Sequence, residues 1–396
     1  MDNCVIPHGY KATALGIIPQ EWEVMLLGNL SNSISSGRNK HRDAHGQYPV
    51  FGSTGIIGYS STYEYEGPVI LVARVGANAG TLNFASGQYD VSDNTLIITI
   101  KQNVYDYNFA YNQLTHYKLN KLVFGSGQPL ITSKQLKNIR IPVPPLAEQR
   151  KIAEVLGVWD KAIEKQARLI EKLALRKRAL MQRLLSAKLR LPGFSEPCKK
   201  IKLGDICERV TRKNIEDYQN VMTISAQRGF VAQTDFFNKS VASETLESYY
   251  LVFRDEFCYN KSYSNGYPMG AIKRLSEAEK AVVTSLYICF NVKPGTDANI
   301  DYLSYYFDNG GLNRGLTKIA NEGGRAHGLL NVTPKDFFGL SFEIPSLKEQ
   351  TAIAKVLTAA DREIELAKEK LERLRRQKRG LMQQLLTGKK RVKYGN

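Results

Sequence analysis

The chain has 396 residues and carries 55 Lys+Arg against 38 Asp+Glu, a formal net charge of +17. This length suggests two or three domains, and the lack of an apolar run of about 18 residues argues against a transmembrane span. The five cysteines are scattered, with no CxxC pair, and the N-terminus has no apolar signal segment. We therefore expect a cytoplasmic protein without a structural metal or membrane contact.

The first predicted unit is a globular domain over residues 1–145. Its first 20 residues form a loose lead-in, and the segment from Trp22 is rich in Gly, Tyr and β-branched residues. Residues 68–73 and 95–100 are predicted to be buried strands, with a glycine-rich turn at 76–80.

A long helix is predicted over residues 146–191. Steps of four and three residues from Ile152 give a seven-residue repeat over more than four heptads, which is typical of a coiled coil. Pro144 and Pro145 precede this helix, and Pro192 with Gly193 ends it. A core helix of an ordinary bundle is the alternative.

Residues 192–345 repeat the plan of the first domain loosely, and residues 346–396 contain a second long helix with its tail. The two helices match at a fixed offset of 201 residues, for example Glu148 with Glu349 and Gln149 with Gln350. Solenoid repeats are about 20–50 residues long, so this spacing indicates a duplicated half-molecule. We expect two α/β (α+β) domains separated by two long helices that form an antiparallel coiled coil, with internal pseudo-twofold duplication.

The positive charge lies on the helices. Residues 148–191 contain 12 Lys+Arg against 5 Asp+Glu, and residues 347–393 contain 14 against 6, so the helices carry +15 of the +17. This distribution favours a polyanion or an acidic partner along the helices, although a solvated helix face is the simpler alternative.

Both helices begin with the pattern P-x-L-x-E-Q-x-x-I-A, at residues 144–153 and 345–354. With two variable α/β segments between such helices, the whole chain resembles the specificity subunit of a type I restriction–modification enzyme. Residues 75–80, 92–94 and 125–129 also resemble elements of that family's target-recognition domains. The second domain departs from the last of these, with GGRAHG at 323–328.

The resemblance implies target-recognition domains that each bind one half of a split site in double-stranded DNA. It implies that the helices act as a spacer, that two methyltransferase subunits dock on the chain, and that translocase–nuclease restriction subunits join them. It also implies a non-catalytic subunit that needs no cofactor.

The sequence also lacks the motifs of catalytic subunits. The Asn/Asp-Pro-Pro-aromatic loop of DNA methyltransferases, the GxxxxGK[ST] phosphate loop and the HExxH metal motif do not occur. His41 and His45 are four residues apart, but they lie in a predicted loop, so an ordinary loop is favoured there over a metal site.

Loop residues suited to base edges and phosphates are the candidate DNA contacts. Each could also belong to an ordinary exposed turn. In the first domain they are Arg38, Asn39, Lys40, Arg42, Arg74, Asn78, Ser126 and Gln128. In the second domain they are Arg228, Lys261, Tyr263, Asn265, Lys273, Arg325 and His327. A coiled-coil scaffold with two protein-binding heads is the alternative function, and an orphan subunit of another methylation system is barely separable from the first hypothesis.

The heptads also predict a register for the antiparallel pair, with the two domains at opposite ends. Ile152 faces Leu385, and the series continues to Leu184 with Ile353. It brings Lys378 to Trp159 and Lys177 to Ala360. We expect these two lysines to reach Asp160 and Asp361, with Lys378 also near the Trp159 indole.

Overall fold

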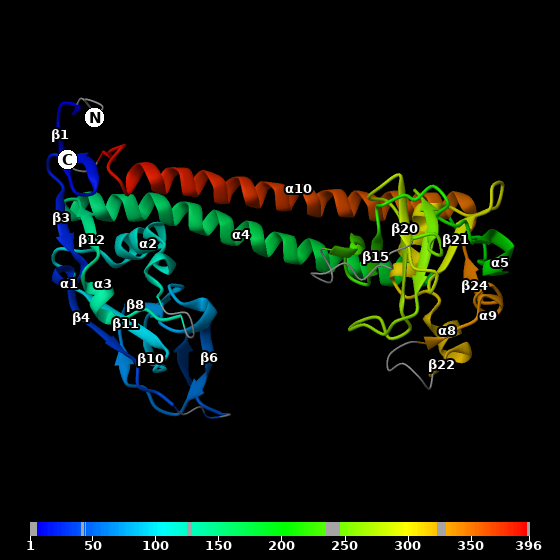
Figure 1. The fold of residues 1–396 in the computed structure, drawn as a ribbon, viewed down its shortest axis with the longest axis horizontal. Coiled ribbons are helices and arrows are strands. Elements are labelled where there is room, and N and C mark those ends of the chain that lie inside the picture. Colours follow the sequence, from blue (N-terminus) through cyan, green and yellow to red (C-terminus); the bar gives the residue numbers. More distant parts are fainter. Residues whose placement is uncertain are drawn as a thin grey trace. The chain divides into compact units, whose positions relative to one another are not determined.

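The computed structural model describes residues 6–40, 43, 45–124, 129–234, 246–322 and 330–393. The chain forms two compact units (Figure 1). Unit 1 contains residues 1–168 and 368–396, and unit 2 contains residues 169–367. Each unit therefore holds one globular domain and one half of each long helix. The predicted domain boundaries, which assign each helix to a segment of its own, remain a prediction.

Unit 1 is built on small sheets, of which the largest two have four strands each. The first has the order β4 (Ser31–Ser36), β11 (Thr95–Ile100), β8 (Val69–Ala73) and β9 (Leu82–Ala85), all antiparallel. The second has the order β6 (Gly55–Ser60), β5 (Tyr48–Gly52), β10 (Gln88–Val91) and β7 (Tyr65–Glu66). Two-stranded pairs join β1 (Tyr10–Thr13) to β2 (Gly16–Pro19) and β3 (Glu23–Leu26) to β12 (Arg140–Val143).

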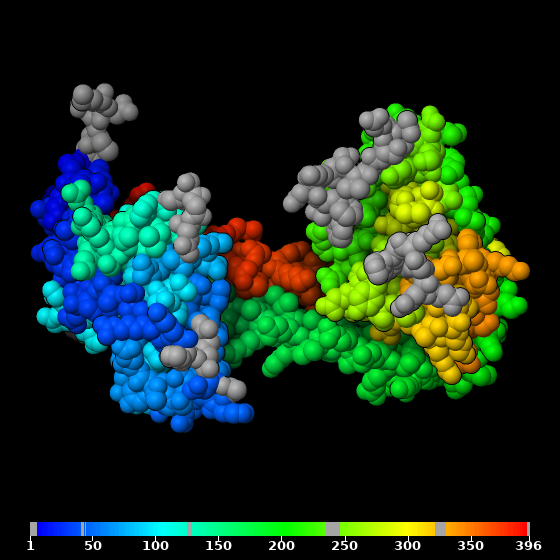
Figure 2. All heavy atoms as spheres, turned by 60° about the horizontal axis from the view of Figure 1, so that its bottom comes forward, coloured from blue at the N-terminus to red at the C-terminus, as the bar shows by residue number. Residues whose placement is uncertain are grey.

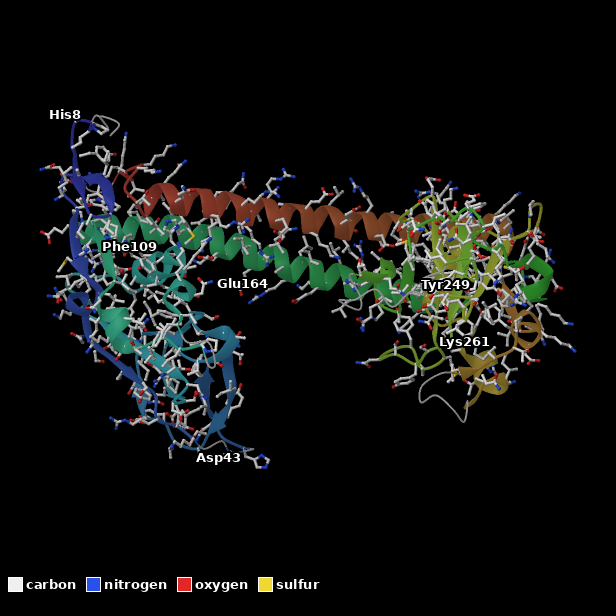
Figure 3. The ribbon with its side chains drawn as sticks, in the orientation of Figure 1. His8, Asp43, Phe109, Glu164, Tyr249 and Lys261 are labelled. Carbon is white, nitrogen blue, oxygen red and sulfur yellow. The ribbon has the colours of Figure 1, made fainter. Side chains whose placement is uncertain are left out.

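Short helices close the core of unit 1: α1 (Leu27–Leu30), α2 (Tyr107–Tyr117) and α3 (Ser133–Lys137). Helix α2 begins where the Asp106 side chain accepts a hydrogen bond from the Phe109 amide, and it ends at Lys118 in the left-handed conformation. Phe109 is fully buried in the same cluster as Ile152 and Leu156 (Figure 3). The globular domain is thus packed directly against the start of the first long helix.

Unit 2 repeats the four-stranded sheet, with the order β14 (Cys207–Val210), β21 (Ile288–Val292), β18 (Phe257–Asn260) and β19 (Ala271–Arg274). Its strand pairs are β15 (Met222–Ser225) with β16 (Gly229–Ala232), β17 (Tyr250–Phe253) with β20 (Lys280–Val283), β13 (Lys199–Lys202) with β24 (Ser341–Ile344), and β22 (Asn321–Glu322) with β23 (Leu330–Asn331). Its helices are α5 (Leu203–Ile206), α7 (Ile300–Asp308), α8 (Asn313–Ile319) and α9 (Pro334–Phe338). Strands β18 and β8 occupy equivalent places in their sheets.

The two long helices are α4 (Leu146–Leu184) and α10 (Leu347–Leu385), and they lie side by side within each unit (Figures 1 and 2). Every heptad position of the predicted seam is buried or half-buried. A fully buried Leu or Ile contributes about 1.5–3 kcal/mol. Together with the ion pairs described next, this confirms the predicted fold class: two mixed α/β domains and a pair of long antiparallel helices.

The predicted register is confirmed within each unit by one lysine. Lys378 Nζ lies 2.5 Å from Asp160 Oδ1 in unit 1, and Lys177 Nζ lies 2.5 Å from Asp361 Oδ1 in unit 2. The expected contact between Lys378 and the Trp159 indole is absent from the contacts of the described residues. The aromatic neighbour is instead found in unit 2, where Lys177 Nζ lies 5.2 Å from the centre of the Tyr305 ring.

The Glu-Gln motif at the start of each long helix joins that helix to its domain. The Gln149 amide accepts from the Asp106 backbone and donates to the carbonyls of Val104 and Pro144. The Gln350 amide does the same with Asn299, Asp297 and Pro345. Both side-chain amides are fully buried, so these backbone partners satisfy polar atoms that water does not reach.

The glutamates of the motif bind the far end of the other helix. Glu148 accepts from Arg391 Nε at 2.6 Å and from the Trp22 indole at 3.0 Å. Its repeat equivalent, Glu349, accepts from Arg190 Nε at 2.7 Å. Each pair joins the two long-helix segments of one unit.

A membrane-spanning helix does not occur in the described part of the chain, where the long helices are too polar to cross a bilayer.

Candidate nucleic-acid interface

In unit 1 the predicted loop residues meet at one edge of the four-stranded sheet. The strand pairing places the end of β4, the end of β8 and the start of β11 together, because Leu96 faces Ser36 and Thr95 faces Ala73. Residues 37–40, 74–80 and 92–94 leave the sheet there. We call these residues edge 1.

The first loop of edge 1 carries three of the candidates. Arg38 is exposed, with Glu64 Oε1 3.9 Å from its guanidinium, and Lys40 is exposed as well. Asn39 is half-buried, and its amide donates to the Asp90 carboxylate. Arg38 and Lys40 therefore project from this edge, whereas Asn39 also helps to fix the loop.

The second loop of edge 1 holds Arg74 and Asn78. Asn78 is exposed within a short 3-10 turn, Gly76–Asn78. This turn packs closely, since a Cβ on Gly80 would lie 2.4 Å from the Asn120 backbone nitrogen. Arg74 is half-buried, and its Nε is fully buried without a hydrogen-bond partner.

Buried hydroxyls without partners accompany Arg74 in the same sheet. Ser92 Oγ and Thr95 Oγ1 are fully buried and make no hydrogen bond to any residue that the structure describes. Buried polar atoms are almost always paired, so edge 1 carries unsatisfied donors and acceptors.

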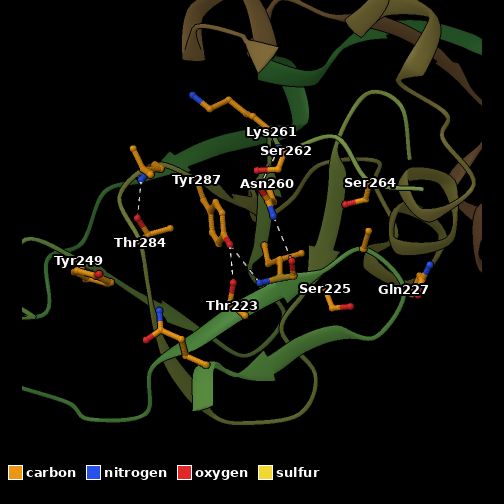
Figure 4. Close-up of a pocket in the computed structure, with 14 residues that line it drawn as sticks. Thr223, Ser225, Gln227, Tyr249, Asn260, Lys261, Ser262, Ser264, Thr284 and Tyr287 are labelled. Atoms are coloured by element: carbon orange, nitrogen blue, oxygen red, sulfur yellow. Dashed lines mark hydrogen bonds between the residues drawn. The ribbon is translucent and has the colours of Figure 1, made fainter. Parts of the chain in front are cut away.

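In unit 2 a corresponding edge surrounds a hollow of about 600 Å³ (Figure 4). Its walls come from β15 and the turn that follows it, from the end of β18 and the segment after it, and from the segment before β21. They contribute residues 223–227, residues 260–262 with Ser264, and Thr284, Leu286 and Tyr287. We call residues 225–228, 261–265 and 284–287 edge 2. Tyr287 and Asn260 hold these segments together, through a 3.0 Å contact with Thr223 Oγ1 and a bond to the Ile224 carbonyl.

The predicted residues of edge 2 have different surroundings. Arg228, Tyr263 and Asn265 are exposed, and the side chain of Tyr263 is 63% accessible. Lys261 is half-buried, and burial lowers the pKa of its amino group (Figure 3). Lys261 lines the hollow, and Arg228, Tyr263 and Asn265 each follow or adjoin a residue that lines it.

Lys273 lies within β19, and its ammonium is held inside the domain. It forms an ion pair with Asp308 and lies 4.9 Å from the centre of the Tyr267 ring. Its charge is neutralised within unit 2, which favours a structural role over DNA contact. Arg42, Ser126, Gln128, Arg325 and His327 lie outside the described residues.

Two of the residues that line the hollow were not among the residues predicted from the sequence. Gln233 and Leu286 line it, and the Leu286 side chain is 63% exposed. Gln227 lies on a different side of the opening from Lys261 (Figure 4). Gln233 directly follows the hairpin of β15 and β16, so a prediction of that hairpin from the sequence would have placed Gln233 beside the start of β15. Nothing in the sequence places Leu286 beside it.

Metal chemistry has no visible site in the described part of the chain. No group of three or more His, Cys, Asp or Glu residues there could hold a metal ion. The two edges offer hydrogen-bond donors, acceptors and cations. This chemistry suits recognition of a polar, anionic ligand.

A duplicated framework with two polar edges defines a recognition protein with two heads. The sequence profile described as the type I restriction modification DNA specificity domain matches residues 19–174 and again residues 195–376. The chain belongs to this family, and it is a type I restriction–modification specificity subunit with two recognition domains.

Known proteins resemble it along its whole length. A Methanocaldococcus jannaschii protein assigned as the MjaX type I restriction enzyme specificity subunit is 26% identical, with 98% of this chain and 97% of that protein covered. The MjaVIII specificity subunit of the same organism is 22% identical, with 96% and 95% covered. The crystal structure of the type I restriction–modification S subunit from M. genitalium has a TM-score of 0.56 at 18% identity, with 92% of this chain and 96% of that chain covered. That likeness supports the fold.

Proposed function

We propose that each domain binds one half of a bipartite site in double-stranded DNA, through edge 1 and edge 2. The observation that carries this proposal is that the segments after β8 and β18, and those before β11 and β21, leave equivalent ends of a repeated sheet. Both edges display polar and cationic side chains, and the framework behind them is repeated. Framework repetition with divergent loops is the pattern expected when two readers share an architecture and differ in target.

The long helices act as the spacer in this proposal. Their register is fixed by buried Leu and Ile and by the lysine–aspartate pairs, so the two readers bind half-sites at a set separation. Half-site centres about 34 Å apart, one helical turn, suit two readers on one face of DNA. The basic surface of the helices is the proposed docking site for two methyltransferase subunits, which restriction subunits then join in the cytoplasm.

The chain itself performs no catalysis in this proposal. The methyltransferase subunits supply the reaction, and this chain selects where it takes place. A coiled-coil scaffold that binds proteins but not DNA is the alternative.

Methylation sequencing of the source genome, with and without this gene, tests the proposal. The expected result is one split motif, modified in its two halves and separated by a fixed gap, that disappears with the gene. Selection of purified complex from random DNA should return the same motif. A single continuous motif would contradict the two half-sites, whereas a methylation pattern that does not change when the gene is removed, with no footprint on DNA, would favour the scaffold.

A further inference from the structure

Arg74 and Lys261 occupy the same place in the two domains. Arg74 is the first residue after β8 and Lys261 the first after β18, and each of these strands lies between the equivalent neighbours of its sheet. Each backbone carbonyl accepts a hydrogen bond from a segment that returns from a distant loop, from the Ile131 amide at 2.8 Å and from the Leu330 amide at 3.0 Å. The two cations are therefore structural counterparts.

Neither cation has an anionic partner among the described residues. Among these residues, the fully buried Arg74 Nε has no acceptor. Burial alone lowers the pKa of the Lys261 amino group, with no described anion or hydrogen-bond partner beside it. Other half-buried cations of unit 2 are neutralised within the fold, Lys273 by Asp308 and Arg274 by Asp301. Taking a charge out of water is costly unless an opposite charge replaces the water. Two unpaired cations at equivalent places indicate two places that await an anion.

The depth of these side chains indicates which part of DNA they reach. Base edges lie at the floor of a groove, so reading them needs side chains that project from the protein, as Arg38, Arg228 and Tyr263 do. Phosphate groups are the outermost atoms of the duplex and carry its charge. A half-buried cation can meet a phosphate without entering a groove.

We propose that Arg74 and Lys261 form a pseudo-symmetric pair of phosphate-binding residues, one for each half-site. They fix the position of each domain on the backbone, while the exposed side chains around them read the bases. This inference rests on the proposed function. It divides the candidate residues of each edge into those that position the domain on the DNA backbone and those that determine which bases it binds.

The test is a double-mutant cycle in which a substitution in the protein is combined with the removal of one phosphate charge from the DNA. Arg74→Met and Lys261→Met are measured in the assembled complex on the bipartite site, together with duplexes that carry one neutral methylphosphonate at each backbone position in turn. Lys134→Met and Lys335→Met are matched controls. Both lysines are exposed and lie at equivalent positions of the repeat, and each substitution removes one positive charge, as Arg74→Met and Lys261→Met do. Arg74→Lys and Lys261→Arg should restore most of the binding.

Each Met variant should weaken binding about tenfold on every sequence and reduce the slope of log affinity against log salt by about 0.9. For Arg74→Met, one methylphosphonate in the first half-site should abolish the difference from wild type. For Lys261→Met, the corresponding duplex should be modified in the second half-site. The controls should show no such coupling to those two positions.

Two results would overturn the assignment. One is coupling to a base analogue such as 7-deazaguanine, with no coupling to any phosphate, which would make the residue a base reader. The other is unchanged affinity in a variant that melts at the wild-type temperature. If wild-type complex bound no bipartite DNA at all, the proposed function would fail first. Wild-type binding without phosphate coupling would reject this inference alone.

Discussion

Gln149 in unit 1 and Gln350 in unit 2 make the same three hydrogen bonds, whereas the two edges have few side chains in common. At edge 1 two exposed basic residues, Arg38 and Lys40, stand beside a half-buried arginine. At edge 2 an open hollow lined by amides and hydroxyls stands beside a half-buried lysine. The contrast separates what holds a domain to the helices, which is repeated, from what meets a ligand, which differs.

Exchange of residues 22–140 for the matching domain of another family member tests this separation most strongly. Binding to the original first half-site should fall more than 100-fold, because each mismatched base pair costs about 1–3 kcal/mol. The second half-site and the gap should not change. Selection from random DNA measures all three, and the donor domain should supply Trp at position 22 to keep its bond to Glu148. A swap that changed both half-sites would contradict the modular interpretation.

Glu148→Ala and Glu349→Ala test whether the repeated framework contacts are equally strong. Each leaves an arginine without its buried carboxylate, and we expect a loss of about 3 kcal/mol in the free energy of unfolding. Glu148→Ala should cost more, because it also leaves the buried Trp22 indole N–H without an acceptor. Urea unfolding measures both. Arg391→Ala and Arg190→Ala are the partner variants for double-mutant cycles, and a coupling energy near zero would show that the pairs contribute nothing.

The pairing of the long helices was predictable because their stability depends on a period that the sequence displays, but α4 ends at Leu184 and not at the predicted residue 191. A strict heptad specifies which residues face the seam, and the two lysines that interrupt it specify the register. The pairs of Glu148 with Arg391 and of Glu349 with Arg190 were missed. The signal was present, since all four residues fall at repeat-equivalent positions.

The edges were predictable only in part. Turn composition identified Arg38, Arg74 and Lys261, and strand pairing then brought each set together. The sequence could not separate Lys273 from Lys261, because the Asp308 that neutralises Lys273 is 35 residues away and on another element. Contacts of this kind depend on tertiary packing, for which a single sequence has no period.

Neutralising the helix surface should act on both heads alike. Arg178 and Arg183 are exposed on α4, and Arg176 is paired with Glu363. Replacing all three by Gln should weaken DNA binding uniformly, by up to about 0.9 in the salt slope for each lost phosphate contact, or weaken retention of the methyltransferase subunits. Titrations at several salt concentrations and size-exclusion chromatography distinguish these outcomes. Relaxed specificity at a single base pair would show that the helices read sequence.

The seam lysines offer the smallest and sharpest comparison, because their ion pairs are alike and their surroundings are not. Asp160 and Asp361 are both partly exposed, with side-chain accessibilities of 53% and 43%, so either pair contributes less than about 1 kcal/mol. Lys177 also lies over the Tyr305 ring, and Asp361 accepts a 2.7 Å hydrogen bond from the Tyr305 hydroxyl. Burial raises the pKa of Tyr305 to about 12, so this hydroxyl remains a donor at neutral pH.

Lys378→Met should therefore change the free energy of unfolding by about 0.5 kcal/mol or less, since methionine fits an apolar seam and the solvated Asp160 tolerates the loss. Lys177→Met should cost about 0.5–1 kcal/mol more, because it also removes the cation from the aromatic ring. The control is the double variant Lys177→Met with Tyr305→Leu. When the ring is already removed by Tyr305→Leu, Lys177 has no aromatic contact to lose. The further cost of Lys177→Met in that background should therefore be smaller than its cost in the wild-type protein. Equal costs for the two lysines in thermal and urea unfolding would show that the ring contact contributes nothing and that the seam is energetically as symmetric as its sequence.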